Sequence, residues 1–374
     1  MPAPPAFYEF FAGGGMARAG LGAGWQALFA NDIDPAKAAS YQANWGADDF
    51  KLGDIADLTT ADLPSHADLA WASFPCQDLS LAGSRRGLAG ARSGMFWAFW
   101  RLIEGLEREG RAPNLIAIEN VAGLLTSNQG RDFAALGEAI ASAGYAFTAF
   151  VIDAVQFLPQ SRPRLFVIAS RNGFPIAEAP AFHTPALMRA VANLSGAAKA
   201  AWQTVCLPAP SARNSDLTSI IEPDPKDIRW RADADTKALL SLMTPLHRAR
   251  VESAAKAGGR HIGTAFRRMR RDPNGQNIQR AEVRFDGVAG CLRTPAGGSS
   301  RQTLIVVEDG AIRTRLLSPR EALRLMGLPD DYTVPPSLNA ALKLAGDGVA
   351  VPVVRHLTEH LFEPLLAAQS RVAA

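Results

Sequence analysis

The chain has 374 residues, 48% of them hydrophobic and 20% charged, which is typical of a folded globular protein and excludes an intrinsically disordered one. No apolar stretch approaches the roughly 20 residues that cross a bilayer, and no charged-then-apolar leader opens the sequence, so we expect a cytoplasmic protein without membrane attachment. The three cysteines are far apart, which argues against disulfides and against a zinc site. We therefore expect no bound metal.

The net charge of +3 is too small to indicate a polyanionic partner, but the charge is unevenly distributed. Between Arg260 and Arg301 nine arginines stand against three acidic residues. Such a window suits contacts with phosphate and guanine, although a solvated surface would also carry it. The charge pattern alone leaves nucleic-acid binding open.

The first 170 residues alternate short apolar runs with segments of helical spacing. Strands are predicted over residues 6–11, 25–30, 67–74, 115–118, 147–155 and 165–169. Helices are predicted over residues 36–44, 95–109 and 133–143. This rhythm predicts an α/β fold with a doubly wound, mostly parallel sheet. Its last two strands should form an antiparallel pair at one edge, because no helix separates them.

From about residue 174 the periodicity weakens and stays weak through residue 310, which predicts a second, smaller domain of irregular or short-strand structure. Ser318 and Pro319 then mark the start of a helix, since proline is favoured in a first helical turn. Residues 349–366 have the spacing of a final amphipathic helix. We therefore expect a larger domain of residues 1–178 with 341–374, and a smaller one of residues 179–340.

A glycine-rich loop, Phe11-Ala12-Gly13-Gly14-Gly15, joins the first predicted strand to a helix. Glycines let the backbone approach a ligand closely, and a helix N-terminus favours an anionic group. Asp32 follows the second predicted strand and Asp54 ends a short one after it, where they could bind ribose hydroxyls and an adenine amine. These features predict a nucleoside cofactor. Arg18 disfavours a nicotinamide, because it replaces the third glycine of that fingerprint.

A cysteine and a glutamate stand at the ends of two further predicted strands, in Pro75-Cys76-Gln77 and Glu119-Asn120-Val121. In one parallel sheet these ends face the same cleft. A thiolate there could attack an electron-poor ring, such as C6 of cytosine, if an acid protonates or hydrogen-bonds the ring at N3. Burial at the end of an apolar strand should raise the pKa of Glu119 and keep it neutral for this role, with Asn120 holding its geometry.

Two basic segments complete the candidate site. In Gln160-Ser161-Arg162-Pro163-Arg164, strand alternation would place Arg162 and Arg164 on one face, able to hold a base oxygen and a phosphate. Residues 77–94 combine four glycines with Arg85, Arg86 and Arg92, which is typical of a loop that closes on a polyanion. The alternative for Arg162 and Arg164 is an exposed strand face, and the alternative for residues 77–94 is an ordinary surface loop.

These motifs, in this order, resemble those of the bacterial-type DNA (cytosine-5) methyltransferases. Two further segments carry the likeness, Arg320-Glu321-Ala322-Leu323-Arg324-Leu325-Met326-Gly327-Leu328-Pro329 and Gly346-Asp347-Gly348-Val349. The resemblance spans nearly the whole chain except about residues 174–260. It implies a Rossmann-like catalytic domain that binds S-adenosylmethionine and releases S-adenosylhomocysteine, and a smaller target-recognition domain that carries the arginine window. The reaction implied is methyl transfer to C5 of a cytosine flipped out of a specific duplex sequence.

The resemblance also implies roles for individual residues. Cys76 would form a covalent adduct at C6, Glu119 would be the acid at N3, Arg164 would support the activated ring, and Arg162 would contact the DNA backbone or a base. The cofactor pocket would be lined by Phe11, Ala12, Gly13, Gly15, Asp32, Ile33, Asp54, Ile55, Pro75, Asp347 and Val349. The DNA contacts would come from Gln77, Ser80, Arg85, Arg92, Gln160, Arg293, Ser300 and Arg301.

The resemblance implies double-stranded DNA as the partner of a monomeric enzyme associated with the nucleoid. It also allows a cognate restriction endonuclease that acts on the same DNA site. The sequence departs from the family pattern in three places. Gly14-Gly15 replaces the usual Cys-Gly variety after Phe11-Ala12-Gly13, which is a minor change. Asp347-Gly348 stands where Asn-Ser is commoner, and Arg92 lies one residue from the usual arginine of the closing loop.

The sequence disfavours three other functions. A transfer-RNA cytosine methyltransferase on the same scaffold would carry Cys-Phe-Thr soon after Glu-Asn-Val, but Ala122-Gly123-Leu124-Leu125 follows here. A DNA-binding regulator without activity would not need Cys76, Glu119 and Arg164 together. A nicotinamide oxidoreductase is disfavoured because the sequence offers no set of residues for hydride transfer.

Overall fold

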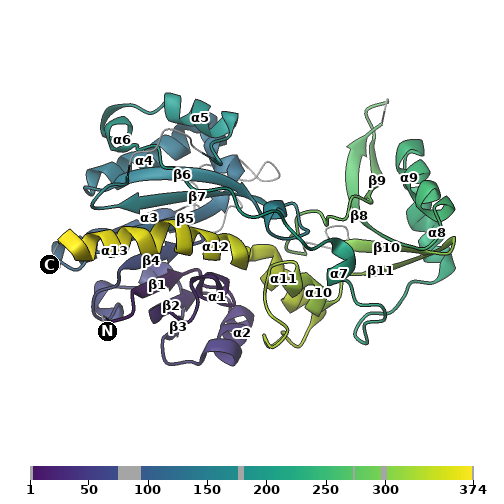
Figure 1. Cartoon of the computed structure of the whole chain (residues 1–374), viewed down its shortest axis with the longest axis horizontal. Helices are drawn as coiled ribbons and strands as arrows, with labels where there is room; N and C mark the ends of the chain where they lie inside the picture. Colours follow the sequence, from purple (N-terminus) through teal and green to yellow (C-terminus); the bar gives the residue numbers. More distant parts are fainter. Residues whose placement is uncertain (1–2, 75–93, 176–180, 273, 296–300, 373–374) are drawn as a thin grey trace. The chain divides into compact units, whose positions relative to one another are not determined.

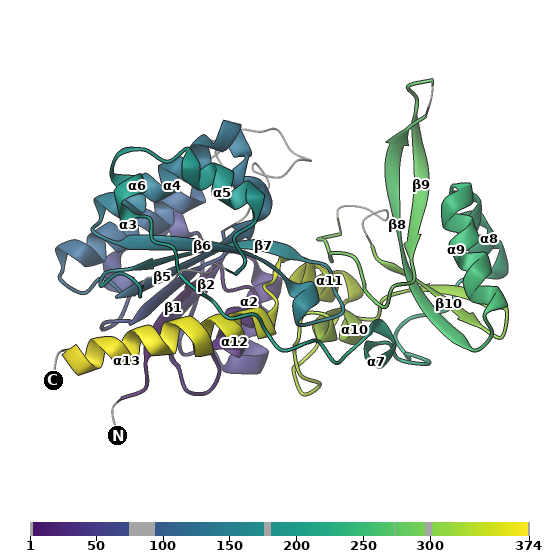
Figure 2. The same cartoon turned by 45° about the horizontal axis from the view of Figure 1, so that its top comes forward.

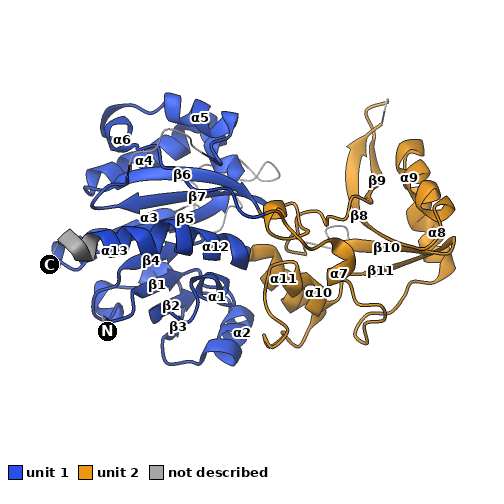
Figure 3. Ribbon diagram, viewed as in Figure 1, with its two compact units in different colours: residues 1–153, 163–211, 349–374 blue, residues 154–162, 212–348 orange. Residues whose placement is uncertain are grey.

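The computed structural model describes residues 3–74, 94–175, 181–272, 274–295 and 301–372. The chain divides into two compact units (Figure 3). Unit 1 contains residues 1–153, 163–211 and 349–374, and unit 2 contains residues 154–162 and 212–348. Within the described ranges, no helix is both long and apolar enough to cross a membrane.

Unit 1 is built on a seven-stranded sheet with the order β3-β2-β1-β4-β5-β7-β6 (Figure 1). Its strands are β1 (Ala6–Phe10), β2 (Gln26–Asp32), β3 (Phe50–Leu52), β4 (Leu69–Ala72), β5 (Leu115–Val121), β6 (Ala146–Asp153) and β7 (Pro163–Ser170). The first five strands pair in parallel, while β7 runs antiparallel to both β5 and β6. The predicted α/β class and the antiparallel pair at one edge are confirmed.

Helices cover both faces of this sheet (Figure 1). They are α1 (Met16–Leu21), α2 (Pro35–Trp45), α3 (Met95–Arg108), α4 (Arg131–Ser142), α5 (Pro185–Ala192), α6 (Gly196–Ala201), α12 (Val351–Leu357) and α13 (Glu363–Val372). A buried cluster that includes Tyr8, Phe10 and Phe99 joins the sheet to α3, α4, α5 and α6. Elsewhere α1 packs on α12, where a Cβ on Gly20 would come within 2.3 Å of Val354. A π-helical turn links α12 to α13, so the predicted final helix is present.

The register of the central strands brings three strand ends together. Phe10 of β1 pairs with Ala72 of β4, which pairs in turn with Ile118 of β5. Strands β2 and β3 lie on one side of β1, and β4 and β5 lie on the other, so the strand order reverses between β1 and β4. In open α/β sheets, ligands bind outside the carboxyl ends of the strands at such a switch point. The segments that follow these three residues are therefore in the position of a ligand site.

Unit 2 contains a four-stranded antiparallel sheet with the order β11-β10-β8-β9 (Figure 2). Its strands are β8 (Arg260–Arg271), β9 (Asn277–Arg284), β10 (Thr303–Glu308) and β11 (Ala311–Leu316), and its helices are α7 (Leu217–Ile220), α8 (Asp233–Ser241), α9 (Pro245–Lys256), α10 (Pro319–Arg324) and α11 (Leu338–Asp347). The sheet is more regular than the expected irregular or short-strand structure, since β8 runs for 12 residues. Alternation is hidden there because residues 262–265 are all buried and the residues after them are mostly arginine.

The unit boundaries differ from the expected domain limits. Residues 179–211 lie in unit 1, because α5 and α6 contribute Leu187 and Ala198 to its core. Residues 154–162 and 341–348 lie in unit 2, where Arg162 donates a hydrogen bond to the Gly346 carbonyl. Short helices and buried polar contacts of this kind leave little periodic signal in a sequence.

Candidate active site

The glycine-rich loop after β1 is tied to the end of β2. The N–H of Gly13 donates to Oδ2 of Asp32 at 2.9 Å, and the N–H of Ala12 donates to the Asn31 carbonyl at 2.9 Å. Gly13 has a φ of +57°, which favours glycine, and no described atom lies within 4 Å of where its Cβ would be. The loop therefore presents open backbone at the switch point, as a ligand that approaches closely requires.

Asp32 is buried, and both its carboxylate oxygens already accept backbone hydrogen bonds, from Gly13 and from Asp34. A carboxylate has further lone pairs, so a ribose could still bind. Asn31 donates from Nδ2 to the carbonyls of Lys51 and Gly53 at 2.9 and 3.0 Å, which holds the chain just before Asp54 beside β2. Sequence reasoning missed this role of Asn31, although the residue adjoins a predicted site residue.

The remaining residues of the predicted cofactor pocket in this region have contrasting surroundings. Ile33 exposes its apolar side chain at the end of β2, whereas Ile55 is buried behind Asp54. Gly15 has a φ of +76°, and a Cβ there would lie 2.3 Å from Nε1 of Trp45. That indole nitrogen donates to the carbonyl of Gly14 at 3.0 Å, so Gly15 leaves room for the ring that holds the loop. Nothing in the sequence singles out Trp45.

The thiol-bearing segment is described only up to Phe74. Pro75, Cys76, Gln77, Ser80, Arg85 and Arg92 lie outside the described residues. Phe74 is buried, and its ring centroid lies 6.4 Å from that of Phe11 in the glycine-rich loop. Asn120 donates from Nδ2 to the Phe74 carbonyl at 3.3 Å. The end of β5 therefore anchors the backbone immediately before Pro75.

Glu119 and Arg164 meet in unit 1. Glu119 is 5% exposed, and its Oε1 lies 3.1 Å from Nε of Arg164. Because β7 runs antiparallel to β5, the first residues of β7 lie beside the last residues of β5, and Arg164 pairs with Val121. Arg164 also donates from Nη1 to the Pro163 carbonyl. The sheet thus holds an acid and a guanidinium together at the edge where β1 and β4 also end.

Arg162 does not share this environment, contrary to the prediction from strand alternation. It is 1% exposed, and it donates from Nη1 to the carbonyl of Leu292 at 3.0 Å and from Nη2 to those of Gly346 and Gly348 at 2.8 and 2.6 Å. The alternation fails because β7 begins after Arg162, which belongs to unit 2. The Arg162 guanidinium therefore joins segments of unit 2, and its predicted contact with the DNA backbone or a base stays a prediction.

Gln160 is buried as well. Its Nε2 donates to the Leu325 carbonyl at 2.6 Å, and its Oε1 accepts from the Leu292 N–H at 3.1 Å. Gln160 therefore makes its hydrogen bonds inside unit 2, and its predicted contact with DNA stays a prediction. Gln160 and Arg162 both bind backbone at Leu292, so the two residues hold the same loop.

The other predicted residues belong to unit 2, except for Val349, which belongs to unit 1. Asp347 is exposed and accepts a hydrogen bond from the Thr294 hydroxyl, while Val349 is buried in unit 1. Arg293 is exposed, and Arg301 donates to Oδ1 of Asn339 at 2.5 Å. Ser300 lies outside the described residues.

Sequence reasoning missed a buried acid beneath the glycine-rich loop. Glu9 is 1% exposed, in the middle of β1, and it accepts hydrogen bonds from the backbone N–H groups of Ala17 and Arg18. Burial raises the pKa of Glu9 to about 8, and the nearby Arg18 only partly opposes this. The signal was present in the sequence, because Glu9 is the one charged residue of an otherwise apolar strand.

Glu9→Gln is expected to flatten the pH dependence of stability. The pKa of Glu9 is about 8 when folded and near 4.5 ordinarily, so its contribution is complete below about pH 4.5, falls as the pH rises, and is lost above about pH 8. The slope is roughly 1.4 kcal/mol per pH unit in that window. Urea unfolding at several pH values should show the variant more stable than the wild type near pH 8. If the free energy of unfolding changed equally with pH in the wild type and in Glu9→Gln, this prediction would be wrong. Glu104→Gln, on the exposed side of α3, serves as the control.

The sequence of this chain is similar to that of known proteins over nearly its whole length. The sequence model of the family described as C-5 cytosine-specific DNA methylase matches residues 6–363. Type II methyltransferase M.HhaI of Haemophilus parahaemolyticus is 26% identical over 361 residues, covering 95% of this chain and 93% of the relative. Type II methyltransferase M.NlaX of Neisseria lactamica is 26% identical over 367 residues, covering 97% and 98%.

Two solved structures share the fold. The S. pombe Dnmt2 methyltransferase superposes with a TM-score of 0.61 at 18% identity, covering 96% of this chain and 99% of that one. The Entamoeba histolytica methyltransferase EhMeth superposes with a TM-score of 0.64 at 14% identity, covering 96% and 98%. At these identities the likeness establishes the architecture alone.

Proposed function

Because this chain belongs to the C-5 cytosine-specific DNA methylase family, and is thereby an enzyme of the DNA (cytosine-5) methyltransferase class, we propose that it transfers a methyl group from S-adenosylmethionine to C5 of a cytosine in duplex DNA. The observation that carries the proposal is the pair of Glu119 and Arg164, which lies at the same edge of the sheet as the switch point between β1 and β4. Unit 1 would be the catalytic part and unit 2 the part that recognises the target.

The residues at the switch point fit S-adenosylmethionine. The open space above Gly13 admits a ligand against the backbone, and the carboxylates of Asp32 and Asp54 suit ribose hydroxyls and an adenine amine. The exposed Ile33 offers an apolar surface to a flat base. When bound, the cofactor supplies an electrophilic methyl group. Phe11 and Val349 would complete the pocket.

The chemistry assigned to the protein follows from the need to activate cytosine. The Cys76 thiolate adds to C6 and forms an S–C bond, while Glu119 holds a proton at N3, so that the electron pair displaced from the ring is stabilised. Arg164, which pairs with Glu119, would support the activated ring. C5 would then take the methyl group that the cofactor supplies, with S-adenosylhomocysteine as the leaving group. Loss of the C5 proton to water would break the C6–S bond and release the Cys76 thiolate, and the proton at N3 would return to Glu119. The cytosine reaches these groups by leaving the duplex stack.

A duplex that contains 5-fluorocytosine tests the covalent step. Fluorine at C5 cannot leave as the proton does, so the wild-type enzyme with S-adenosylmethionine is expected to form a complex that resists denaturation. Cys76→Ala should form none, whereas Cys206→Ala, which removes an exposed thiol, should form as much as the wild type. If Cys76→Ala still forms the complex, the nucleophile is assigned wrongly.

The curated relatives are named Type II methyltransferases, and this supports a specific duplex target with a cognate restriction endonuclease. Plasmid DNA from cells that express the chain would be sequenced after bisulfite treatment, alongside their transfer RNA. Protected cytosines in one short DNA sequence are the expected result. Protection in transfer RNA alone would contradict the proposed substrate.

A further inference from the structure

The hairpin of β8 and β9 extends beyond the sheet that carries it (Figure 2). Strand β10 pairs with β8 only from Arg260 to Ala265, whereas β9 stays paired with β8 as far as Arg271. Near the sheet, Ala265 and Val283 are buried in the cluster that α8 and α9 complete. Farther out, residues 268–271 are exposed, so the hairpin continues as a two-stranded ribbon. The major groove of B-DNA is wide enough to admit such a ribbon.

The ribbon is cationic on both faces. Residues 266–282 contain five arginines and two acidic residues. The cross-strand register places Arg268, Arg270 and Arg280 on the face of Glu282, and it places Arg267, Met269 and Arg271 on the opposite face with Gln279. Because phosphates line both walls of a DNA groove, cations on both faces suit a ribbon that lies inside it.

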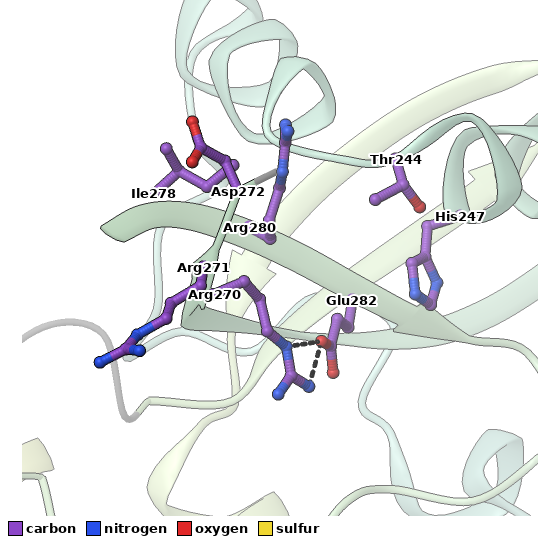
Figure 4. A pocket seen from close by; sticks show the side chains of 8 residues that line it. All are labelled: Thr244, His247, Arg270, Arg271, Asp272, Ile278, Arg280 and Glu282. Atoms are coloured by element: carbon purple, nitrogen blue, oxygen red, sulfur yellow. Dashed lines mark hydrogen bonds and ion pairs between the residues drawn. The ribbon is translucent and has the colours of Figure 1, made fainter. Parts of the chain in front are cut away.

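Glu282 holds Arg270 by one edge of its guanidinium (Figure 4). Nε of Arg270 donates to Oε1 of Glu282 at 2.6 Å, and Nη2 of Arg270 pairs with the same oxygen. The second carboxylate oxygen lies 3.6 Å from Nε of Arg268. A guanidinium is a planar fork, so engagement of its Nε edge leaves the Nη1 and Nη2 end for another pair of acceptors. That end is accessible, because the Arg270 side chain is 50% exposed.

The surroundings of the Arg270–Glu282 pair leave space for a base. Arg270 and Glu282 line an open pocket of about 240 Å³, to which α9 contributes His247 and the loop before it Thr244 (Figure 4). His247 is occupied with the β9 backbone, since its Nδ1 lies 3.1 Å from the Val283 carbonyl. Most of the remaining pocket wall belongs to the arginine-bearing ribbon, which contributes Arg270, Arg271, Arg280 and Glu282.

We propose that Arg270, oriented by Glu282, reads a guanine of the recognition sequence. In the major groove guanine presents O6 and N7 as an acceptor pair that matches the free end of a guanidinium. An arginine already held on one edge loses less conformational freedom on binding than a mobile one. Arg270 is thus a specificity-determining residue and Glu282 a positioning residue. The inference rests on the proposed duplex substrate.

Arg271 provides the contrast within the same ribbon. In the described part of the hairpin, its side chain makes no ion pair and no hydrogen bond. It is exposed, it borders the same pocket, and the register places it on the opposite strand face from Glu282. A mobile, unclamped guanidinium suits a phosphate, which accepts from many directions and carries no sequence information. Arg270 would therefore contact a base and Arg271 a phosphate, although the two residues are adjacent in the sequence.

The test compares recognition sequences. Wild type, Arg270→Ala, Glu282→Gln and Arg271→Ala would methylate a library of duplexes randomised around a cytosine, and the products would be sequenced. Arg270→Ala is expected to lose discrimination at one G·C pair by about tenfold to a hundredfold, the range of one bidentate base contact. Glu282→Gln should relax the same position less. Arg271→Ala should weaken all sites equally and lower the salt dependence of binding by about one ion.

Arg248→Ala is the control, because Arg248 is exposed on α9, is paired with Glu252 and does not line the pocket beside Arg270. It should leave both specificity and affinity unchanged. If Arg270→Ala lowers methylation of every sequence equally, Arg270 grips phosphate and the inference is wrong. If Arg270→Ala loses discrimination at one base pair but Glu282→Gln methylates the same sequences as the wild type, the orienting role of Glu282 is wrong. A wild type that methylates no duplex would overturn the proposed function itself, which distinguishes that failure from these.

Discussion

Glu119→Gln is expected to lower the rate of methyl transfer by roughly two to four orders of magnitude, the usual contribution of a general acid. The amide keeps the shape of the side chain but cannot supply a proton to N3 of the target base. Glu119 is buried and lies against Arg164, so no solvent acid can take its place. Transfer of a radioactive methyl group to duplex DNA, measured under single-turnover conditions, reports the loss directly.

Affinity for the cofactor separates this effect from a general disturbance of the site. S-adenosylmethionine should bind Glu119→Gln about as tightly as the wild type, as measured by calorimetry, because the proposed cofactor residues follow β1, β2 and β3. Glu104→Gln, on the exposed side of α3, is the matched control and should retain full activity. A loss of less than tenfold in Glu119→Gln would show that this carboxyl is not the acid.

Glu321→Ala is expected to destabilise unit 2 by about 3–5 kcal/mol, the cost of leaving a buried charge without its partner. Arg315 and Glu321 are both 0% exposed, and two hydrogen bonds of 2.8 and 2.7 Å join them. The same carboxylate accepts the backbone N–H groups of Ser318 and Glu222. Removing the Glu321 carboxylate leaves the buried Arg315 guanidinium and the backbone N–H groups of Ser318 and Glu222 without this acceptor. Urea unfolding followed by circular dichroism measures the change.

Two further variants sharpen the interpretation of that measurement. Glu359→Ala breaks an exposed pair with Arg355 on the last helix and should change stability by no more than about 0.5 kcal/mol. Replacing Arg315 by Met and Glu321 by Leu together should recover much of the stability lost in Glu321→Ala, because no unpaired charge then remains. Stability within about 1 kcal/mol of the wild type in Glu321→Ala would refute the buried-pair argument.

The α/β class, the mostly parallel sheet and the antiparallel pair at its edge were predictable from local pattern. The apolar runs over residues 6–11, 67–74 and 115–118 predicted strands of one mostly parallel sheet, and the parallel pairing of β1, β4 and β5 agrees. The capped helix start at Ser318 was also predictable, since Glu321 completes a capping box there. These features depend on neighbours along the chain, and the sequence displays such neighbours directly.

What the sequence by itself determined about this protein is its α/β class, its family motifs and the segments that approach the switch point. Only the tertiary structure decided which polar groups meet. Arg164 joins Glu119, whereas Arg162, two residues earlier, is buried among carbonyls of residues more than a hundred positions away. Glu282 clamps Arg270 but not Arg271, because the hairpin register puts successive side chains on opposite faces. Burial and hydrogen-bond partners are set by contacts between distant segments, and local residue order does not specify those contacts.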